Sequence, residues 1–216
     1  MIYNLDHYFL FVHIPRTGGM SITHAIFEAL PKSYVNLLEW RHRYAMHIQR
    51  IEEIENHFYT MYKFAIVRNP WDIVESDYSL TLKDIHQPTF LSRIGASGHW
   101  LQRLDRVSRY SGFDEFVFKE YLEDVSPVLE GGFYHTWCCG PEGQKIGVQP
   151  ILFQELDQRW PDICGVIGIP EGTLPHDNHV ERAECVWSPS SRDAIADLCH
   201  RDLEEFNFDF NGTLCS

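Results

Sequence analysis

A buried strand that runs into a glycine turn and then a helix is the feature that most constrains how this chain can fold. Residues 8–14 are rich in aromatic and β-branched side chains and nearly all apolar, as expected for a strand covered on both faces. The turn at 15–19 reads Pro-Arg-Thr-Gly-Gly. Apolar residues then recur at helical spacing over 21–30, and a proline follows. This strand–loop–helix unit is typical of α/β folds.

The loop between this strand and helix has the composition of an anion site. Gly18 and Gly19 let the backbone turn sharply and approach a ligand closely, and the start of a helix favours negative charge. Arg16 adds a positive charge, and Thr17 and Ser21 add hydroxyl groups. The basic residue precedes the glycines, whereas in the Walker pattern a lysine follows them, which argues against an ordinary ATPase or kinase. The alternative is a plain Gly-Gly turn capped by the serine.

A second strand, residues 62–67, repeats this pattern: it ends at a basic residue, Arg68, and a helix follows. Open α/β sheets bind ligands at the carboxyl ends of their strands, where this arginine is expected. Arg68 and Ser76 could together hold a second phosphate. In the alternative interpretation the arginine pairs with Asp72 or Glu75, and the serine faces solvent.

The remaining pattern alternates helices and strands. Further elements are expected as helices at 50–58, 100–109, 113–123 and 190–206, a short strand at 151–153, and a loop at 130–147. The alternation predicts an α/β fold with a mainly parallel central sheet flanked by helices. No linker divides the sequence, so one domain over 1–216 is expected.

The chain carries a formal charge of −13, from 18 basic and 31 acidic residues. An acidic surface repels polyanions, which disfavours nucleic acid as a partner. One local exception is a set of arginines near the middle of the chain. Its members are Arg93, Arg103, Arg106 and Arg109. These arginines are interpreted as the solvated face of a helix, with a local groove for an anionic acceptor as the alternative.

No stretch approaches the roughly 18 apolar residues that a membrane helix requires. The sequence start shows no cleavable signal pattern, so the chain is expected to be soluble, and cytoplasmic if it is complete. A lumenal domain trimmed of an anchor is the alternative. The six cysteines form no CxxC pair and no Cys/His spacing typical of zinc, so no zinc site is expected.

Taken together, the two basic motifs resemble those of sulfotransferases that use 3′-phosphoadenosine 5′-phosphosulfate (PAPS), and most closely the carbohydrate type, the heparan sulfate 2-O/6-O group and its bacterial relatives. The family's 5′-phosphosulfate loop reads PKTGGTS or PRTGGTS, and residues 15–21 here read PRTGGMS. Its 3′-phosphate motif reads RNPxxRxxSxY, and residues 68–78 read RNPWDIVESDY. The resemblance continues through segments similar to SFxEF, RFENL, LPHxN and FGYxF, at 113–117, 153–156, 174–178 and 206–210.

Three positions depart from the family pattern. Met20 replaces a hydroxyl residue of the loop, Ile73 replaces the arginine of the second motif, and Leu152 stands where the RFENL arginine would be. The first two departures are expected to weaken donor binding.

The resemblance implies a P-loop-like three-layer fold and an enzyme that moves a sulfuryl group from PAPS to a hydroxyl, without metal. The implied acceptor is a carbohydrate, a glycolipid or a small alcohol. In this interpretation Arg16 neutralises charge on the leaving oxygen, and residues 16–21, including Met20, bind the 5′-phosphate. Arg68 and Ser76 bind the 3′-phosphate.

The same resemblance places the general base at His42, which matches a family His-x-x-Ala position. Nearby arginines would lower the pKa of this imidazole, favouring the neutral base. The alternative for the base is His47. His176 is a candidate to line the acceptor side, whereas His13 is expected to be structural. Two rival functions stay open: a P-loop-like nucleotide kinase or phosphotransferase, and a non-catalytic module that binds PAPS or its product PAP.

Overall fold

The computed structural model describes residues 1–30, 34–35, 57–86, 98–125, 129, 131–140, 143–175 and 180–211. They fall into two compact units. The first comprises the described residues of 1–68 and 130–178, and the second those of 69–129 and 179–216. The single domain expected over 1–216 stays a prediction.

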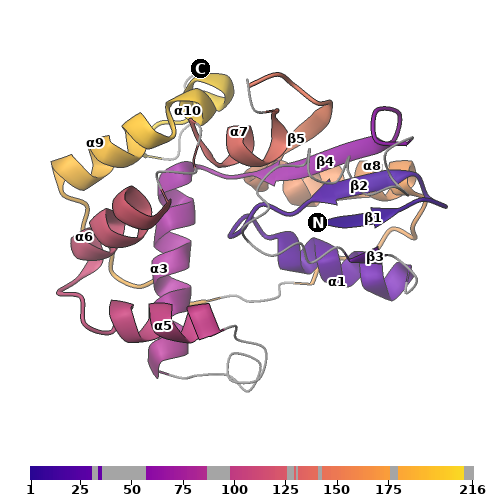
Figure 1. The fold of residues 1–216 in the computed structure, drawn as a ribbon. Helices are drawn as coiled ribbons and strands as arrows, with labels where there is room; N and C mark the ends of the chain where they lie inside the picture. The colour runs from indigo at the N-terminus through magenta and orange to yellow at the C-terminus, as the bar shows by residue number, and fades with distance from the viewer. Residues whose placement is uncertain are drawn as a thin grey trace. The chain divides into compact units, whose positions relative to one another are not determined.

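The first unit is built on a five-stranded sheet with the order β3-β1-β2-β4-β5 (Figure 1). The strands are β1 (Ile2–Asn4), β2 (Phe9–Val12), β3 (Tyr34–Val35), β4 (Tyr62–Val67) and β5 (Val148–Leu152). Strands β2, β4 and β5 are parallel, whereas β1 pairs antiparallel with both β2 and β3. The α/β class is therefore confirmed, but the sheet is mixed rather than mainly parallel.

The antiparallel pairing follows from a short turn that the sequence interpretation missed. Residues 5–8 connect β1 to β2, too few for the crossover that a parallel pair needs. Within this turn the Asn4 side-chain oxygen accepts a hydrogen bond from the His7 amide at 2.9 Å. Tyr8 takes a left-handed backbone conformation, with φ 57°, immediately before β2 begins.

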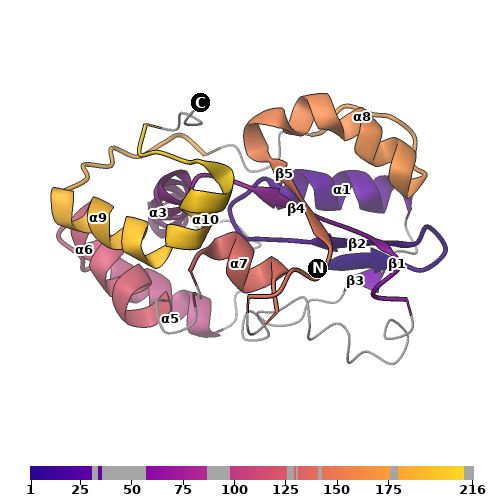
Figure 2. The same ribbon diagram turned by 90° about the horizontal axis from the view of Figure 1, so that it is seen from above.

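Helices pack on both faces of this sheet. They are α1 (Gly19–Ala29), α7 (Phe133–Cys138) and α8 (Leu156–Ile167), and a single 3₁₀ turn, η4 (Phe153–Glu155), joins β5 to α8. Figure 2 shows α1 and α8 on one side of the strands and α7 on the other. Tyr134 of α7 donates a hydrogen bond from its hydroxyl to the Val148 carbonyl of β5 at 2.8 Å.

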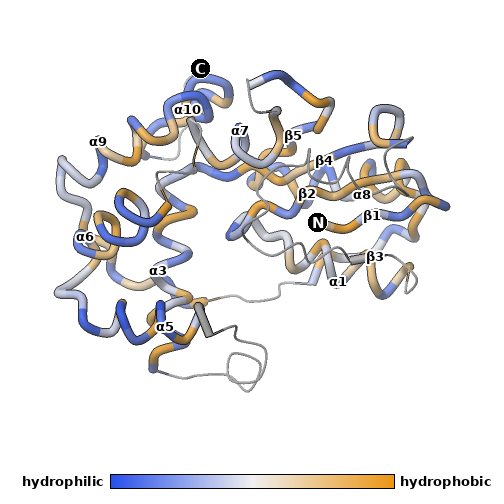
Figure 3. The backbone as a smooth tube through the Cα atoms, in the orientation of Figure 1, coloured by the Kyte–Doolittle hydropathy of each residue, from blue (hydrophilic) through white to orange (hydrophobic). Residues whose placement is uncertain are grey.

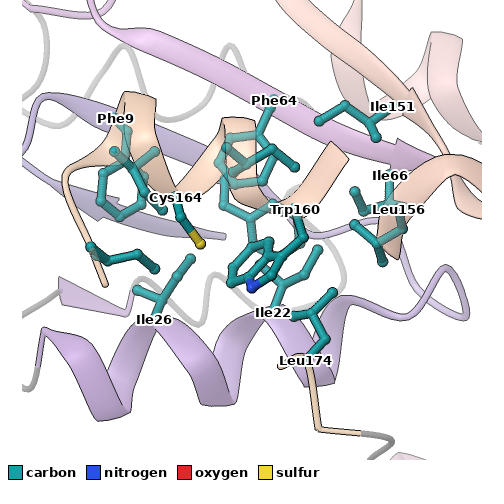
Figure 4. Close-up of a cluster of buried hydrophobic side chains, with 14 of the residues drawn as sticks. Phe9, Ile22, Ile26, Phe64, Ile66, Ile151, Leu156, Trp160, Cys164 and Leu174 are labelled. Atoms are coloured by element: carbon teal, nitrogen blue, oxygen red, sulfur yellow. The ribbon is translucent and has the colours of Figure 1, made fainter. Parts of the chain in front are cut away.

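The core of the first unit lies between the sheet and the helices α1 and α8. Figure 4 shows Ile22 and Ile26 of α1 and Trp160 of α8 meeting Phe9 and Phe64 of the sheet. All five side chains are buried. Burying apolar groups stabilises a fold by roughly 25 cal/mol per Å², so this cluster anchors the loop that joins β2 to α1.

The second unit is helical. Its elements are α3 (Pro70–His86), α5 (Gly98–Val107), α6 (Phe113–Phe116), the π-helix η2 (Val117–Val125), α9 (Pro189–Leu198) and α10 (His200–Phe206). In Figure 3 helices α5 and α9 alternate between hydrophilic and hydrophobic residues along their turns, as amphipathic helices do. At the start of α3 the Asn69 side chain accepts a hydrogen bond from the Trp71 amide at 3.1 Å. Pro70 stands at the first helical position, where its missing amide hydrogen leaves no donor unsatisfied.

The central arginines differ from their expected outward placement. Arg103 donates to Asp77 at 2.6 Å and to Glu120 at 2.8 Å, and its side chain is only 15% exposed. Arg106 also donates to Glu120 at 2.8 Å. Arg109 does lie on the surface, beside Asp105, whereas Arg93 lies outside the described residues. Interpreting Arg103 as part of a solvated face was therefore wrong, because buried carboxylates far away in sequence draw it inward.

This ion network shifts the ionisation of its members. Burial alone would raise the pKa of Glu120, but hydrogen bonds from Arg106 and the charge of Arg103 hold that pKa below its ordinary value. Burial of the Tyr110 phenol, together with its hydrogen bond to Glu120, raises its pKa to about 12. Glu120 is thus a buried carboxylate that stays charged at neutral pH, compensated by two arginines.

None of the helices in the described part combines the length and the apolar character that crossing a membrane requires.

Candidate functional site

The loop between β2 and α1 has an unusual backbone. Arg16 and Gly18 both have positive φ, 66° and 82°. A positive φ is uncommon for a residue with a side chain, whereas glycine adopts it readily. Gly18 is also the residue that caps α1, and the Ser21 amide donates back to the Gly18 carbonyl at 3.1 Å. The chain therefore enters the helix through a tight, left-handed turn.

The first turn of α1 is suited to hold an anion. It carries no acidic residue, so no carboxylate of that turn offsets the positive end of the helix dipole. The amides at positions 19 and 20 belong to the group of helix-start donors that have no acceptor within their own helix. Met20 is half-exposed at this point, which leaves the turn open to solvent.

Arg68 is placed against this loop. It follows the last residue of β4, and its guanidinium donates from Nη1 to the Arg16 carbonyl at 3.0 Å. The Nε atoms of both arginines are buried. Because β2 and β4 are parallel neighbours, their carboxyl ends meet at one edge of the sheet. The structure thus brings two of the predicted site residues together.

A third strand end contributes a residue that the sequence interpretation included in the RFENL-like segment but gave no role in the site. Phe153 follows β5, and the Arg68 guanidinium carbon lies 4.8 Å from the centre of its ring. A Cβ added to Gly18 would stand 2.9 Å from Phe153 Cε2. The aromatic ring therefore touches both the loop and the arginine. The signal that could have found it is its place directly after a strand parallel to the other two.

The His13 ring packs against the loop at Gly19. A Cβ added to Gly19 would stand 2.3 Å from the His13 ring, and that ring stacks on Phe11 with centroids 5.7 Å apart. Burial, with a smaller effect from the neighbouring amino terminus, lowers the pKa of His13 to about 4. The imidazole is therefore neutral at pH 7. These contacts fit the structural role expected for this histidine.

Replacing Gly19 with alanine is expected to destabilise the chain by about 1–3 kcal/mol, because the new methyl group overlaps the His13 ring. The free energy of unfolding, measured by urea titration, tests this. In the His13→Ala background the same glycine substitution should cost less, because the smaller side chain makes room for the methyl group.

The matched control is Gly165→Ala, an exposed glycine inside α8 whose added Cβ meets nothing within 4 Å. That variant should be stabilised by roughly 0.5–1 kcal/mol, since alanine favours the helix. If Gly19→Ala proved as stable as the parent chain, the close packing of the loop on His13 would be contradicted.

The two hydroxyl residues predicted to bind phosphate, Thr17 and Ser21, differ in burial and in hydrogen bonding. The Thr17 hydroxyl is buried and donates to the Ile14 carbonyl at 2.8 Å, so in this structure its hydrogen stabilises the loop itself. Ser21 is half-buried in the first turn of α1. The assignment of both hydroxyls to a phosphate stays a prediction.

The remaining candidates belong to the second unit or fall outside the described residues. Ser76 is a half-buried residue of α3 in the second unit, and its assignment to the 3′-phosphate stays a prediction. Ile73, which replaces the family's arginine, is only 2% exposed. His42, His47 and His176 lie outside the described residues. Within the described part, no group of three or more His, Cys, Asp or Glu side chains is arranged to hold a metal ion.

Comparisons of the chain with protein-family models, with curated proteins and with solved structures give no match.

Proposed function

We propose that this chain binds PAPS at the loop between β2 and α1 and transfers its sulfuryl group to a hydroxyl acceptor. The observation that carries the proposal is the hydrogen bond from Arg68 to the Arg16 carbonyl, at the carboxyl edge of two adjacent parallel strands. It places two guanidinium-bearing residues at one helix start. That arrangement suits a ligand with two separate anionic groups.

The order of residues in the loop favours PAPS over magnesium-bound ATP. A P-loop kinase needs a lysine after the glycines, and this chain has Met20 and Ser21 there. Its basic residue, Arg16, comes earlier. In the proposed mode the helix start and Arg16 hold the 5′-phosphosulfate, and Arg68 receives the 3′-phosphate that distinguishes PAPS from ATP. Such a donor site belongs to a three-layer, P-loop-like fold, which we propose for the chain.

The donor supplies an activated sulfuryl group. In the transfer, an acceptor oxygen forms a bond to sulfur while the bond between sulfur and the 5′-phosphate oxygen breaks, and PAP leaves. Arg16 neutralises the charge that builds on the leaving oxygen. The acceptor hydroxyl gives its proton to a base, for which His42 remains our proposal. The acceptor is a carbohydrate, a glycolipid or a small alcohol.

Transfer of radiolabelled sulfate from PAPS to an array of hydroxyl acceptors tests this function. The chain is expected to label at least one neutral sugar, glycolipid or alcohol without added metal. His42→Ala should abolish labelling while PAP binding persists. His200→Ala is the matched control, because His200 is an exposed residue of α10 whose ring forms a hydrogen bond with the Asp197 carbonyl of α9.

Two outcomes would count against the proposal. Full transfer by His42→Ala would remove that residue from the role of base. PAP binding without transfer to any acceptor would favour the non-catalytic module, an alternative that the replacement of a loop hydroxyl by Met20 makes worth testing.

A further inference from the structure

Phe153 is an aromatic residue whose position core packing does not explain. Its side chain is 38% exposed, although it is large and apolar. It begins the 3₁₀ turn η4, immediately after β5, at the same sheet edge as the loop and Arg68. The exposure of this large apolar ring beside a candidate anion site therefore needs a physical explanation.

The ring makes two contacts that link the parts of the site. On one side the Arg68 guanidinium carbon lies 4.8 Å from the ring centre, within the range of a cation–π interaction. On the other side the ring lies so close to Gly18 that an added Cβ would stand 2.9 Å from Cε2. The ring therefore fills the space between the arginine and the loop backbone.

These contacts restrict the arginine. A free arginine side chain has many rotamers, and ordering one on binding a ligand reduces affinity. Here a hydrogen bond to the Arg16 carbonyl fixes one end of the guanidinium, and the Phe153 ring supports its face. The group is held in place before any ligand arrives.

We propose that Phe153 is a positioning residue that holds the Arg68 guanidinium against the loop and thereby gives the chain its preference for nucleotides with a 3′-phosphate. This inference rests on the proposed function, since it assigns Arg68 to that phosphate. Phe153 acts through the arginine. Its loss should therefore weaken binding of a 3′-phosphorylated nucleotide more than binding of one without that group.

The test compares PAP with adenosine 5′-monophosphate (5′-AMP), which lacks only the 3′-phosphate, by titration calorimetry without metal. In Phe153→Leu the preference for PAP over 5′-AMP should fall about tenfold, the scale of a partly desolvated cation–π contact. Phe153→Tyr keeps the ring and should retain the preference. Phe118→Leu, at a phenylalanine of similar exposure in η2, should leave it unchanged.

The outcomes separate this inference from the proposed function. If the parent chain fails to prefer PAP, the proposed function is wrong and this inference falls with it. If the parent prefers PAP and Phe153→Leu keeps the full preference, only the positioning role is overturned. Should Phe153→Leu not fold, Phe153→Met, which is unbranched and apolar, takes its place with the same expected loss.

A second readout needs no nucleotide. The ring current of Phe153 should shift the Arg68 side-chain NεH resonance in an ¹⁵N–¹H spectrum, with the peak assigned by its disappearance in Arg68→Lys. That shift should vanish in Phe153→Leu and persist in Phe153→Tyr. An Arg68 resonance at the same position in parent and Phe153→Leu would contradict the contact itself.

Discussion

Replacing Arg68 with methionine is expected to weaken PAP binding about 100-fold, because removing one partner of a desolvated charge pair costs 2–5 kcal/mol. The structure holds this guanidinium at the edge of the loop, 3.0 Å from the Arg16 carbonyl. Methionine has similar bulk but no charge and no donor. Titration calorimetry with PAP measures the loss directly.

Two comparisons make this prediction specific. Binding of 5′-AMP should change less than about threefold, because that nucleotide has no 3′-phosphate for Arg68 to hold. Arg159→Met, at an exposed arginine of α8 with only a loose 3.6 Å pair to Asp162, should leave both affinities unchanged. An equal loss for both nucleotides would mean that Arg68 supports the loop rather than the 3′-phosphate.

Replacing Glu120 with alanine is expected to destabilise the chain by about 3 kcal/mol or more. Its carboxylate is only 3% exposed and accepts hydrogen bonds from Arg103, Arg106 and Tyr110, each at 2.8 Å. Without it, two arginines lose a compensating charge, and Arg103 is largely buried. The free energy of unfolding from urea titration gives the magnitude.

The matched control is Glu123→Ala on the same π-helix. Glu123 is 61% exposed and pairs with Lys119 at the surface, where such pairs contribute about 0–1 kcal/mol. The two substitutions are chemically identical, so the difference between them isolates burial. If Glu120→Ala and Glu123→Ala had equal free energies of unfolding, the ion network around Glu120 would contribute no more to stability than a surface pair.

The elements nearest the candidate site could be predicted from the sequence. The strand expected at 62–67 matches β4, and the helix expected after the glycines matches α1 within two residues. Both are strongly patterned because each packs an apolar surface into one core. The loop between β2 and α1 was recognisable because its proline, arginine and glycines interrupt the apolar pattern of the strand before it and of the helix after it.

Other elements were missed for physical reasons. Helix α8 contains Pro161 and Gly165, which disfavour helix interiors, although Leu156, Trp160 and Ile163 recur at helical spacing. Helix α7 has only six residues and lies within the range expected to be a loop. Strand β1 has three residues, so its pattern is too short to be distinguished. Without β1, the sheet was expected to be mainly parallel.

Long-range pairing explains the remaining differences. Arg103 turns inward because it pairs with Asp77 and Glu120. These carboxylates lie 26 and 17 residues away in the sequence, so no local pattern shows that they meet the arginine. Phe153 similarly gains its contacts from two other strand ends. Spacing along the chain identified the candidate charges, whereas their partners depend on tertiary packing.

The central claim is that this loop binds a 3′-phosphorylated sulfate donor, and calorimetry with PAP and with magnesium-ATP tests it most directly. The account predicts that PAP binds without magnesium, and that magnesium-ATP binds at least tenfold more weakly, since its third phosphate has no place at Arg68. Tight binding of magnesium-ATP together with no binding of PAP would contradict the account.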